Sequence, residues 1–450
     1  DGNPLVVRER VNMLADDGTL ERDGDRWRLT IDADAIDVPP TIISLLASRV
    51  ERLPDDERRA IERAAGIGTD FDRGTLAAIA MEDGAPEPLG VVLDRLRRRD
   101  LVEPSGAWSG DHPVYRFHHV LVRDAAYRRL LKERRAALHE LVGWHVDEHH
   151  PGGDETDVVV AHHFEQVVRY RSALGIVDPD TDELAREAVV RLRRSADAAL
   201  AREDLPAAGS AARRALDLVD ETSAERDELL LVGCEALLSS GDVVAAEPLV
   251  RELTDRSTDD RLAAWADCFR AQRWSLTDPD RLSEAADVSD AAAETLGGLG
   301  DPAGVAKARL VRAGCLARLG RVGECESELD LALGAARDAG DRRRTVAVLG
   351  AAPLAALWGP SPVSRAGGRC LDVLRLLRIT TASPAVETTS IRCQAVLEAL
   401  RGRIDSAREK LEQSRATSRE LGMRQGLFEA ELFAGIVERW AGGPGGAEPP

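Results

Sequence analysis

The side chains best suited to chemistry in this 450-residue sequence are its nine histidines. All nine lie between His112 and His163, and such a cluster suggests a metal site. The spacing argues against one, because His139-Glu140 is followed by His145, whereas the zinc signature H-E-x-x-H requires a histidine three residues after the glutamate. We therefore expect no bound metal.

The lysines bear on phosphate and Schiff-base chemistry, and there are only three of them, each in a charged, helix-like stretch. They are Lys132, Lys307 and Lys410. None follows a glycine, so the sequence contains no G-x-x-x-x-G-K-[ST] phosphate loop. Paired carboxylates such as Asp259-Asp260 stand at predicted helix starts or in loops without a nucleophile nearby, and no Gly-x-Ser-x-Gly elbow stands out. These residues are thus predicted to hold no complete catalytic site.

Charge and composition restrict the partners. Lys+Arg total 60 against Asp+Glu 79, and the formal net charge of −19 repels nucleic acids and anionic membranes at long range. The six cysteines form no C-x-x-C pair and lie among apolar residues, which is typical of reduced thiols. The longest apolar run, Val346 to Trp358, is too short to span a bilayer and contains Pro353. The sequence therefore predicts no membrane segment and a cytoplasmic location.

The elements that must position these residues are mainly helices. Ala, Leu, Arg and Glu dominate, aromatic residues make up 4%, and alternating β-branched residues are scarce. Periodicity predicts helices over 41–53, 55–65, 73–81, 87–99, 119–131 and 133–149. Two extended stretches, 101–103 and 114–117, are separated by a turn-rich loop, which indicates a β-hairpin. Helices followed by a hairpin predict a winged-helix domain at 39–150, with linker helices at 151–182.

From residue 183 onward the sequence repeats. The breaks between predicted helices end at positions that are successively 38, 38, 41, 41 and 41 residues apart. These positions are Asp204, Asp242, Asp280, Arg321, Pro362 and Arg403. Small residues follow them by four or five positions, so two antiparallel helices can approach closely there. These small residues are Ala208, Ala246, Ala285, Cys325, Ala366 and Ala407.

The repeated unit is similar to a tetratricopeptide helix pair, with helices longer than in the standard repeat of about 34 residues. We therefore predict a mainly α chain in which an α-α superhelix covers 183–440. The concave face of such an array is expected to bind a protein or a small-molecule inducer. A flexible Gly/Pro-rich tail is predicted at 441–450.

The chain opens without a methionine, at Asp1-Gly2-Asn3-Pro4, which suggests a piece of a longer protein. This opening resembles the last helix of the nucleotide-binding module in signal-transduction ATPases with numerous domains (the STAND superfamily). There a Gly-x-Pro motif ends the lid of the module, and its proline contacts the adenine of ADP or ATP. The resemblance implies that residues 1–18 end such a lid, that Gly2 and Pro4 bind the nucleotide, and that residues 19–38 are a connector.

The order of later segments extends the resemblance over residues 1–170. Trp27 and the segments 38–42, 46–54 and 64–68 follow one another as in bacterial STAND members. The order is especially similar to that in ATPases fused to class III nucleotidyl cyclases or to LuxR-type regulators. Beyond about residue 180 only the general repeat character is shared.

The sharpest match is the segment 117–127, which reads Phe-His-His-Val-Leu-Val-Arg-Asp-Ala-Ala-Tyr. It aligns without gaps with the Met-His-Asp motif of plant resistance and apoptotic protease-activating ATPases, whose histidine contacts the β-phosphate of ADP and holds the closed state. The resemblance implies that His119 is the nucleotide-sensing histidine. Two positions depart from the motif: His118 replaces the methionine, and Val120 replaces the acid that helps to stabilise the closed form.

Together these resemblances predict the regulatory and sensor portion of a multidomain STAND ATPase. An inducer on the repeat array would shift a nucleotide-dependent switch and release an effector, for which an adenylate or guanylate cyclase is favoured. ATP or ADP would be held by an upstream nucleotide-binding module that also supplies Mg²⁺, and the active form could be an oligomer. The alternatives are a LuxR-type transcriptional regulator of the same ATPase class and a plain tetratricopeptide adaptor, for which residues 1–170 would be a helical cap.

A winged helix also raises the possibility of DNA binding. The predicted fourth helix ends in a basic tip, Arg95 to Arg99, where a recognition helix could meet phosphates. Asp94 and Asp100 flank this tip, and the net charge of the chain is −19. A solvated basic face is therefore favoured, and no nucleic-acid partner is expected through this chain.

Overall fold

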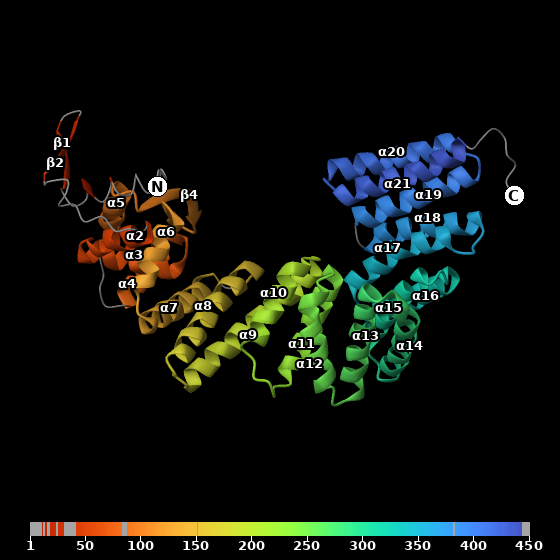
Figure 1. The fold of residues 1–450 in the computed structure, drawn as a ribbon, viewed down its shortest axis with the longest axis horizontal. Coiled ribbons are helices and arrows are strands. Elements are labelled where there is room, and N and C mark those ends of the chain that lie inside the picture. Colours follow the sequence, from red (N-terminus) through yellow and green to blue (C-terminus); the bar gives the residue numbers. More distant parts are fainter. Residues whose placement is uncertain are drawn as a thin grey trace. The chain divides into compact units, whose positions relative to one another are not determined.

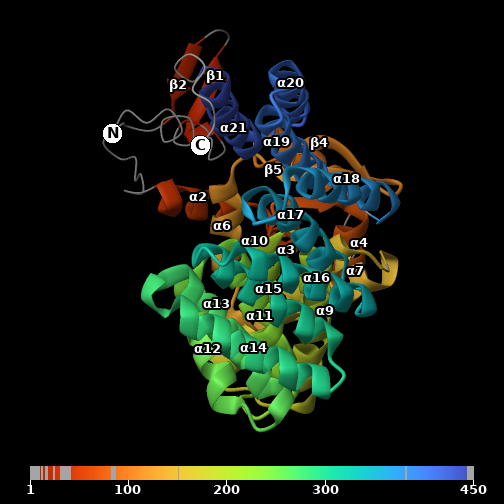
Figure 2. The same ribbon diagram turned by 90° about the vertical axis from the view of Figure 1, so that its right-hand side faces the viewer.

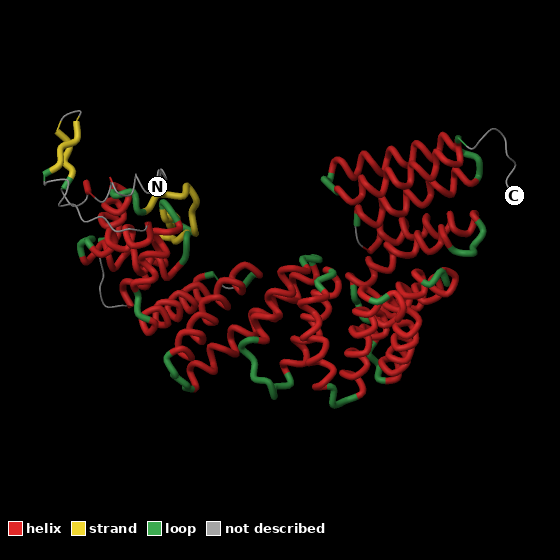
Figure 3. The backbone as a smooth tube through the Cα atoms, viewed as in Figure 1, coloured by secondary structure: helices red, strands yellow, loops and turns green. Residues whose placement is uncertain are grey.

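The computed structural model describes residues 11, 14–15, 19–23, 26–30, 42–82, 88–150, 152–380 and 383–442. Contacts within the chain divide it into two compact units. We call residues 1–195 together with 217–219 the N-terminal unit, and residues 196–216 together with 220–450 the repeat unit. Helices make up most of both units (Figure 1, Figure 3).

The N-terminal unit holds a small hairpin near the start of the described residues. Strands β1 (Leu20–Asp23) and β2 (Arg26–Leu29) pair antiparallel, with Leu20 opposite Leu29. The hairpin lies within residues 19–38, for which the resemblance implies a connector. Its two strands have only four residues each, too few for a period-2 pattern to stand out.

A second, three-stranded sheet belongs to a winged helix. Its antiparallel strands lie in the order β3-β5-β4, and along the chain the elements follow as helix, strand, helix, helix, strand, strand. These elements are α3 (Asp55–Ile67), β3 (Asp70–Asp72), α4 (Arg73–Glu82), α5 (Leu89–Arg98), β4 (Val102–Ser109) and β5 (His112–Phe117). This succession is the winged-helix topology that the hairpin and its preceding helices predict. The other helices of the unit are α2 (Ile42–Glu51), α6 (Val120–Arg129), α7 (Lys132–His149) and α8 (Asp154–Ala173).

Strand β3 is the element of the winged helix that the sequence pattern does not reveal. It has only three residues, and its central residue Phe71 pairs with Tyr115 on β5. The Phe71 ring lies 6.0 Å from the Tyr115 ring and 5.6 Å from the Phe117 ring, centroid to centroid. Burial of Phe71 against the hairpin, rather than local propensity, therefore explains why this segment is extended.

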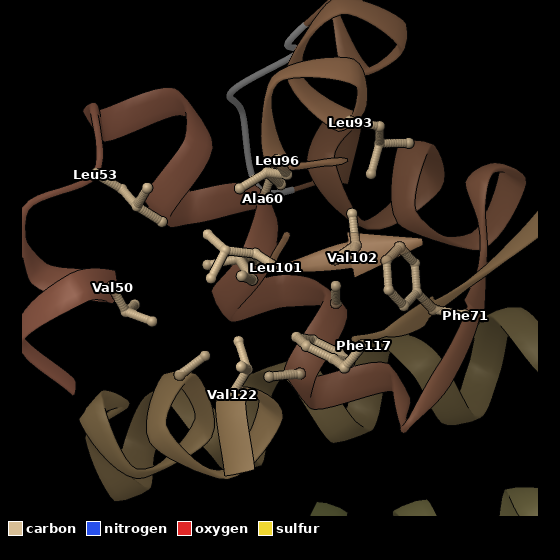
Figure 4. Packing of buried hydrophobic residues seen from close by; sticks show 14 of the residues in the cluster. Val50, Leu53, Ala60, Phe71, Leu93, Leu96, Leu101, Val102, Phe117 and Val122 are labelled. Carbon is tan, nitrogen blue, oxygen red and sulfur yellow. The ribbon is translucent and has the colours of Figure 1, made fainter. Parts of the chain in front are cut away.

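One hydrophobic core joins the helices, the hairpin and α6 (Figure 4). Leu96 on α5, Val102 on β4, Phe117 on β5 and Val122 on α6 all belong to it and are buried. Phe117 and Val122 lie on either side of the loop between β5 and α6. Their burial fixes the start of α6, which is where His119 lies.

The repeat unit is a series of paired helices (Figure 1, Figure 2). Helix α9 (Pro179–Ala201) spans the boundary between the two units. The helices that follow are α10 (Leu205–Leu216), α11 (Glu225–Ser240), α12 (Val243–Arg256), α13 (Asp260–Thr277), α14 (Leu282–Gly298), α15 (Pro302–Arg318), α16 (Val322–Asp338), α17 (Arg342–Trp358), α18 (Val363–Thr380), α19 (Pro384–Leu400), α20 (Ile404–Glu420) and α21 (Arg424–Ala441).

The predicted helix breaks coincide with turns of the repeat unit. All six lie between an odd-numbered helix and the even-numbered helix that follows it. At the turn after α11, for example, Gly241 ends the helix in the left-handed conformation, with φ at 81°. The six small residues that follow the breaks are all buried, which confirms that close approach of the paired helices selects them.

The odd-numbered helices line the inner side of the array. From α11 to α21 each odd-numbered helix packs against the next odd-numbered helix as well as against its own partner. In a curved stack, the layer whose neighbours touch is the layer nearer the centre of curvature. Helices α11, α13, α15 and α17 therefore form the concave wall of this part of the chain, which is a tetratricopeptide-like helical repeat protein.

The sequence analysis also made predictions about the cysteines and about membrane-spanning segments. All six cysteines lie in the repeat unit, and they are buried and not disulfide-bonded. Among the described helices, none is long and apolar enough to cross a membrane.

Candidate functional site

Of the three residues that the resemblance assigns to nucleotide binding, only His119 is described. Gly2 and Pro4 lie outside the described residues. His119 is the N-cap of α6, with extended backbone angles of φ −147° and ψ 140°. Its Nδ1 atom accepts a hydrogen bond of 3.1 Å from the backbone N–H of Leu121.

This hydrogen bond decides the tautomer of His119. A neutral imidazole that accepts at Nδ1 carries its proton on Nε2. The structure shows no hydrogen-bond partner for Nε2 within the described ranges, and the side chain is half-buried. The Nε2–H group is therefore free to donate to an oxygen of a bound group.

The residues beside His119 have different roles. His118 turns to the hairpin, where its Nδ1 lies 3.3 Å from Oε2 of Glu103. Val120, at the position of the motif acid, is 49% exposed. The site thus offers a hydrogen-bond donor at His119 and no carboxylate at position 120.

Behind α6, four aromatic side chains form what we call the His–Tyr network. The hydroxyl of Tyr127 lies 2.7 Å from Nε2 of His139 and 2.8 Å from the hydroxyl of Tyr170. Nδ1 of His139 lies 2.7 Å from Nδ1 of His163. The three contacts link α6, α7 and α8. Because a neutral imidazole has one donor and one acceptor, His139 donates one of its two hydrogen bonds and accepts the other.

The His–Tyr network is electrically neutral. Burial lowers the pKa of His139 and of His163, and the neighbouring histidines His163 and His162 lower them further. Burial also raises the pKa of Tyr127. The network therefore fixes the packing of three helices without holding a charge, and in the described part of the chain no group of three or more His, Cys, Asp or Glu side chains is arranged to hold a metal.

The basic tip of α5 is largely committed to contacts within the winged helix. The buried carboxylate of Glu57 forms ion pairs with Arg95 and Arg99, and the Nε atom of each arginine lies 3.0 Å from a carboxylate oxygen. Arg97 pairs with Asp94 at 3.5 Å. Most of the cationic charge that a DNA-binding helix would direct at phosphates is thus neutralised by acids of the same unit.

A second site, which sequence reasoning missed, lies on the inner side of the repeat unit. We call it the Glu235 cluster: Glu235 on α11, Lys307 on α15, and Arg343 and Arg344 at the start of α17. Oε2 of Glu235 accepts from Nζ of Lys307 at 2.9 Å and from Nη2 of Arg344 at 3.1 Å. Oε1 accepts from Arg343 and, at 3.1 Å, from the hydroxyl of Ser239.

Electrostatic attraction overcomes the cost of burying this cluster. Burial alone would raise the pKa of Glu235, but Lys307, Arg344 and Arg343 hold that pKa well below its usual range. Burial lowers the pKa of Lys307, although Glu235 opposes the change. Three cations on one carboxylate leave a surplus of positive charge, of which Asp341 neutralises a part through Arg344.

Two cavities border the Glu235 cluster. The polar cavity, of about 240 Å³, is lined by the cluster and by Gln272, Ser275, Arg318 and other residues of α11, α13, α15 and α17. A second cavity, which we call the wide cavity, has a volume of about 500 Å³. It is lined by Arg261 and Trp265 of α13 and by the three arginines 342–344. The guanidinium of Arg344 lies 5.5 Å from the centre of the Trp265 ring.

Three features of the sequence point to the residues of the Glu235 cluster, although helical periodicity alone does not single them out. Glu235 is the single charged residue within the apolar run 229–238. Lys307 precedes the buried Val311 by four residues and so falls on the buried stripe of its helix. The arginines 342–344 open a helix, where cations are disfavoured by the helix dipole. Each anomaly marks a side chain that the fold uses for a contact far along the chain.

Comparisons with known proteins give fold likeness only. No family model matches the sequence, and no curated protein matches it. A STAND protein with a tetratricopeptide-repeat sensor from Pyrococcus horikoshii is 13% identical, over 98% of this chain and 65% of that chain, with a TM-score of 0.39. This chain therefore spans 65% of the length of that protein.

Two further solved structures show a similar degree of likeness. A Rap protein complexed with competence and sporulation factor is 13% identical, over 69% of this chain and 94% of that chain, with a TM-score of 0.40. Aspartyl phosphate phosphatase F from Bacillus subtilis is 10% identical, over 92% of this chain and 99% of that chain, with a TM-score of 0.38. At these TM-scores the likenesses are too weak to support a functional argument.

Proposed function

We propose that this chain is the regulatory and sensor portion of a STAND-type signalling ATPase. The observation that carries the proposal is the position of His119: it caps α6 directly after the winged-helix hairpin and keeps its Nε2–H free to donate. A neutral donor at a helix N-terminus is suited to a phosphate oxygen. The winged-helix topology and the repeat unit that follows it agree with this assignment.

In this function the nucleotide is held mainly by an upstream module, which also binds Mg²⁺. ATP or ADP supplies the charge difference that the switch reads. His119 donates Nε2–H to an oxygen of the β-phosphate, and Pro4 packs on the adenine. Val120 provides no carboxylate, so the closed state depends on His119 and on packing within the N-terminal unit.

The repeat unit would bind the inducer on its inner side and shift the switch by stabilising one of its two states. The released effector would be a nucleotidyl cyclase, or in the alternative a LuxR-type DNA-binding domain. The active form would be an oligomer in the cytoplasm. A plain adaptor function is the second candidate, favoured by the Glu235 cluster and its cavities, because they lie wholly within the repeat unit and need no nucleotide.

The test uses the full-length protein and a substitution that separates capping from nucleotide sensing. His119→Ser keeps a side-chain acceptor for the N–H of Leu121 but removes Nε2–H. We expect it to weaken ADP retention and to change basal effector output, whereas the control His118→Ser should leave ADP retention unchanged. Unchanged ADP binding in His119→Ser, or a full-length sequence without an upstream phosphate loop, would refute the proposal and favour the adaptor.

A further inference from the structure

The repeat unit carries two neighbouring cavities of different chemistry, both of which are lined by α15 and α17. The polar cavity lies over the Glu235 cluster. A second, which we call the apolar cavity, has about 430 Å³ and lies between α15, α16 and α17. Leu310 and Gly314 on α15 line both cavities, so the two are adjacent along that helix.

The polar cavity has donors to spare but no spare carboxylate. Glu235 accepts four hydrogen bonds, from Lys307, Arg343, Arg344 and Ser239, which fills its acceptor sites. Lys307 and Arg343 each have one hydrogen-bonding partner within the described ranges, and each retains further N–H groups. Nε of Arg344 is buried without a partner among the described residues.

The charge of the polar cavity points to an anion. Its lining includes the four cations Lys307, Arg318, Arg343 and Arg344 but only one acid, Glu235. This surplus stands out in a chain whose formal net charge is −19. An incoming carboxylate would gain charge-assisted hydrogen bonds in a cavity where screening by water is reduced.

The apolar cavity next to it is suited to a large side chain. It is lined mainly by Ala, Leu and Val residues together with Cys325 and Trp358. Trp358 is 55% exposed and Leu354 is 37% exposed, although both lie on a concave wall. Exposed large apolar side chains within a cavity favour burial by a ligand.

The dimensions fit an extended peptide. Lys307, Leu310, Gly314 and Arg318 form one stripe along α15, and the separation of eleven positions between its ends corresponds to roughly 16 Å at about 1.5 Å per residue. All four residues line the polar cavity, and the middle two also line the apolar cavity. About five residues of an extended peptide cover the same length. Such a segment could place a carboxylate in the polar cavity and an apolar side chain in the apolar cavity.

We propose that the repeat unit binds a peptide segment in which an Asp or Glu carboxylate lies close to a large apolar side chain. The carboxylate binds the spare N–H groups of Lys307, Arg343 and Arg318, and the apolar side chain packs against Trp358. This inference rests on the proposed function only in assigning ligand binding to the repeat unit. It makes no use of nucleotide or effector.

Peptide binding by the whole chain, residues 1–450, tests the ligand class. The probe is a fluorescein-labelled hexapeptide with glutamates on either side of a phenylalanine, measured by fluorescence anisotropy without nucleotide. Replacing both glutamates by glutamine, or the phenylalanine by serine, should each weaken binding by about tenfold or more. Acid and amide forms of the C-terminus distinguish a side-chain carboxylate from a terminal one, since only the latter loses affinity on amidation.

Matched substitutions locate the site. Arg318→Glu reverses the charge of an exposed side chain that lines the polar cavity, and should lower the affinity for the labelled peptide by about tenfold or more. Arg337→Glu makes the same charge change on an exposed arginine of α16 that lines neither cavity, and should leave affinity within about twofold. Gly314→Leu places a large side chain where the two cavities adjoin. A Cβ at this position would meet no atom within 4 Å, so the fold can accept the change. Gly435→Leu on α21, where a Cβ likewise meets no atom within 4 Å, is the control.

Several outcomes would overturn the inference. They are equal binding of the glutamine peptide, equal binding by Arg318→Glu and Arg337→Glu, or displacement of the probe by a single-stranded oligonucleotide at lower concentration than by unlabelled peptide. Because the assay contains no ATP or ADP, a failure to bind the peptide would not contradict the proposed nucleotide switch, which the His119→Ser variant tests separately. Conversely, loss of the switch would leave peptide binding intact.

Discussion

The two units each bury a polar network, and the two networks are built on opposite principles. The His–Tyr network of the N-terminal unit is neutral, and its members bond to one another. The Glu235 cluster of the repeat unit is ionic, and its cations outnumber its acid. The His–Tyr network joins the consecutive helices α6, α7 and α8. The Glu235 cluster joins α11, α15 and α17, which lie far apart in sequence, and it borders two cavities.

The difference follows from the physics of burial. A neutral network that satisfies its own donors and acceptors specifies packing and leaves little capacity for a ligand. A buried carboxylate that attracts three cations is held in place, but the cations keep unused donors and a net charge. The first arrangement is typical of a structural joint, and the second of a binding surface.

The largest expected effect tests whether the ionic cluster also holds the repeat unit together. Glu235→Gln leaves Lys307 and Arg343 without a counter-charge and Arg344 with Asp341 alone, and should lower the local free energy of unfolding by about 3 kcal/mol. Hydrogen–deuterium exchange of α11 and α17 measures the change. Glu247→Gln, which removes a half-exposed partner of Arg251 and Arg273, is the control and should cost about 0.5 kcal/mol or less.

Acid should affect the neutral network first. The pKa values of His139 and His163 are lowered in the folded chain, whereas in the unfolded chain both groups titrate near 6.5. Below that pH the unfolded state binds more protons, so the N-terminal unit loses up to about 1.4 kcal/mol per histidine for each unit of pH.

Calorimetry of the whole chain at pH 7.5 and 5.5 measures this loss. The pKa of Glu235 is lowered, so its contribution to the stability of the repeat unit stays in place until the pH falls below about 4.5, where the unfolded chain takes up the proton. A repeat unit that melts earlier than the N-terminal unit on mild acidification would contradict the comparison.

Removing one hydroxyl tests whether the His–Tyr network is a joint. Tyr127→Phe keeps the ring but deprives His139 and Tyr170 of their shared partner, at an expected cost of about 2 kcal/mol. Urea denaturation followed by tryptophan fluorescence is suitable, because the Trp144 ring packs on Phe164 at 4.9 Å beside the network. Tyr115→Phe serves as the control and should be close to neutral.

The smallest effect is expected when one cation of the Glu235 cluster is removed instead of its carboxylate. Lys307→Met keeps the apolar stem and removes one of three cations, so Glu235 retains Arg343 and Arg344. We expect a loss of about 1 kcal/mol or less, because replacing a buried ion by an apolar residue of similar volume removes a desolvation cost. Hydrogen exchange of α11 should show a change at least twofold smaller in free energy than Glu235→Gln; equal losses would mean that the cations do not substitute for one another.

Local pattern predicted most of the fold. The helical stripes of the winged helix, the hairpin and the periodic breaks of the repeat unit all appear at the expected positions, because each depends on residues close together in sequence. Strand β3 escaped prediction because its three residues are extended only through pairing of Phe71 with Tyr115, 44 positions later. Strand β4 is longer than predicted, since Ser105 and Gly106 conceal its extension within a turn-like composition.

The candidate sites divide in the same way. The sequence motif identified His119, and its place as the N-cap of α6 follows from the buried Phe117 and Val122 on either side. Glu235 and Arg343 are 108 residues apart, and no local pattern connects them. Their meeting depends on the curvature of the repeat unit, which brings the start of α17 to the inner face of α11.

The sequence by itself determined the class of the helices and of the β4–β5 hairpin, the turns within the repeats and the one motif with a histidine at a helix start. It could do so because helix periodicity, capping and small-residue contacts are local. Only the tertiary structure decided which charged side chains are buried together, since that depends on the stacking of helices over four successive repeats. The absence of a phosphate-loop lysine can be read from the sequence, whereas the buried lysine at position 307 shows its electrostatic role only where the inner helices meet.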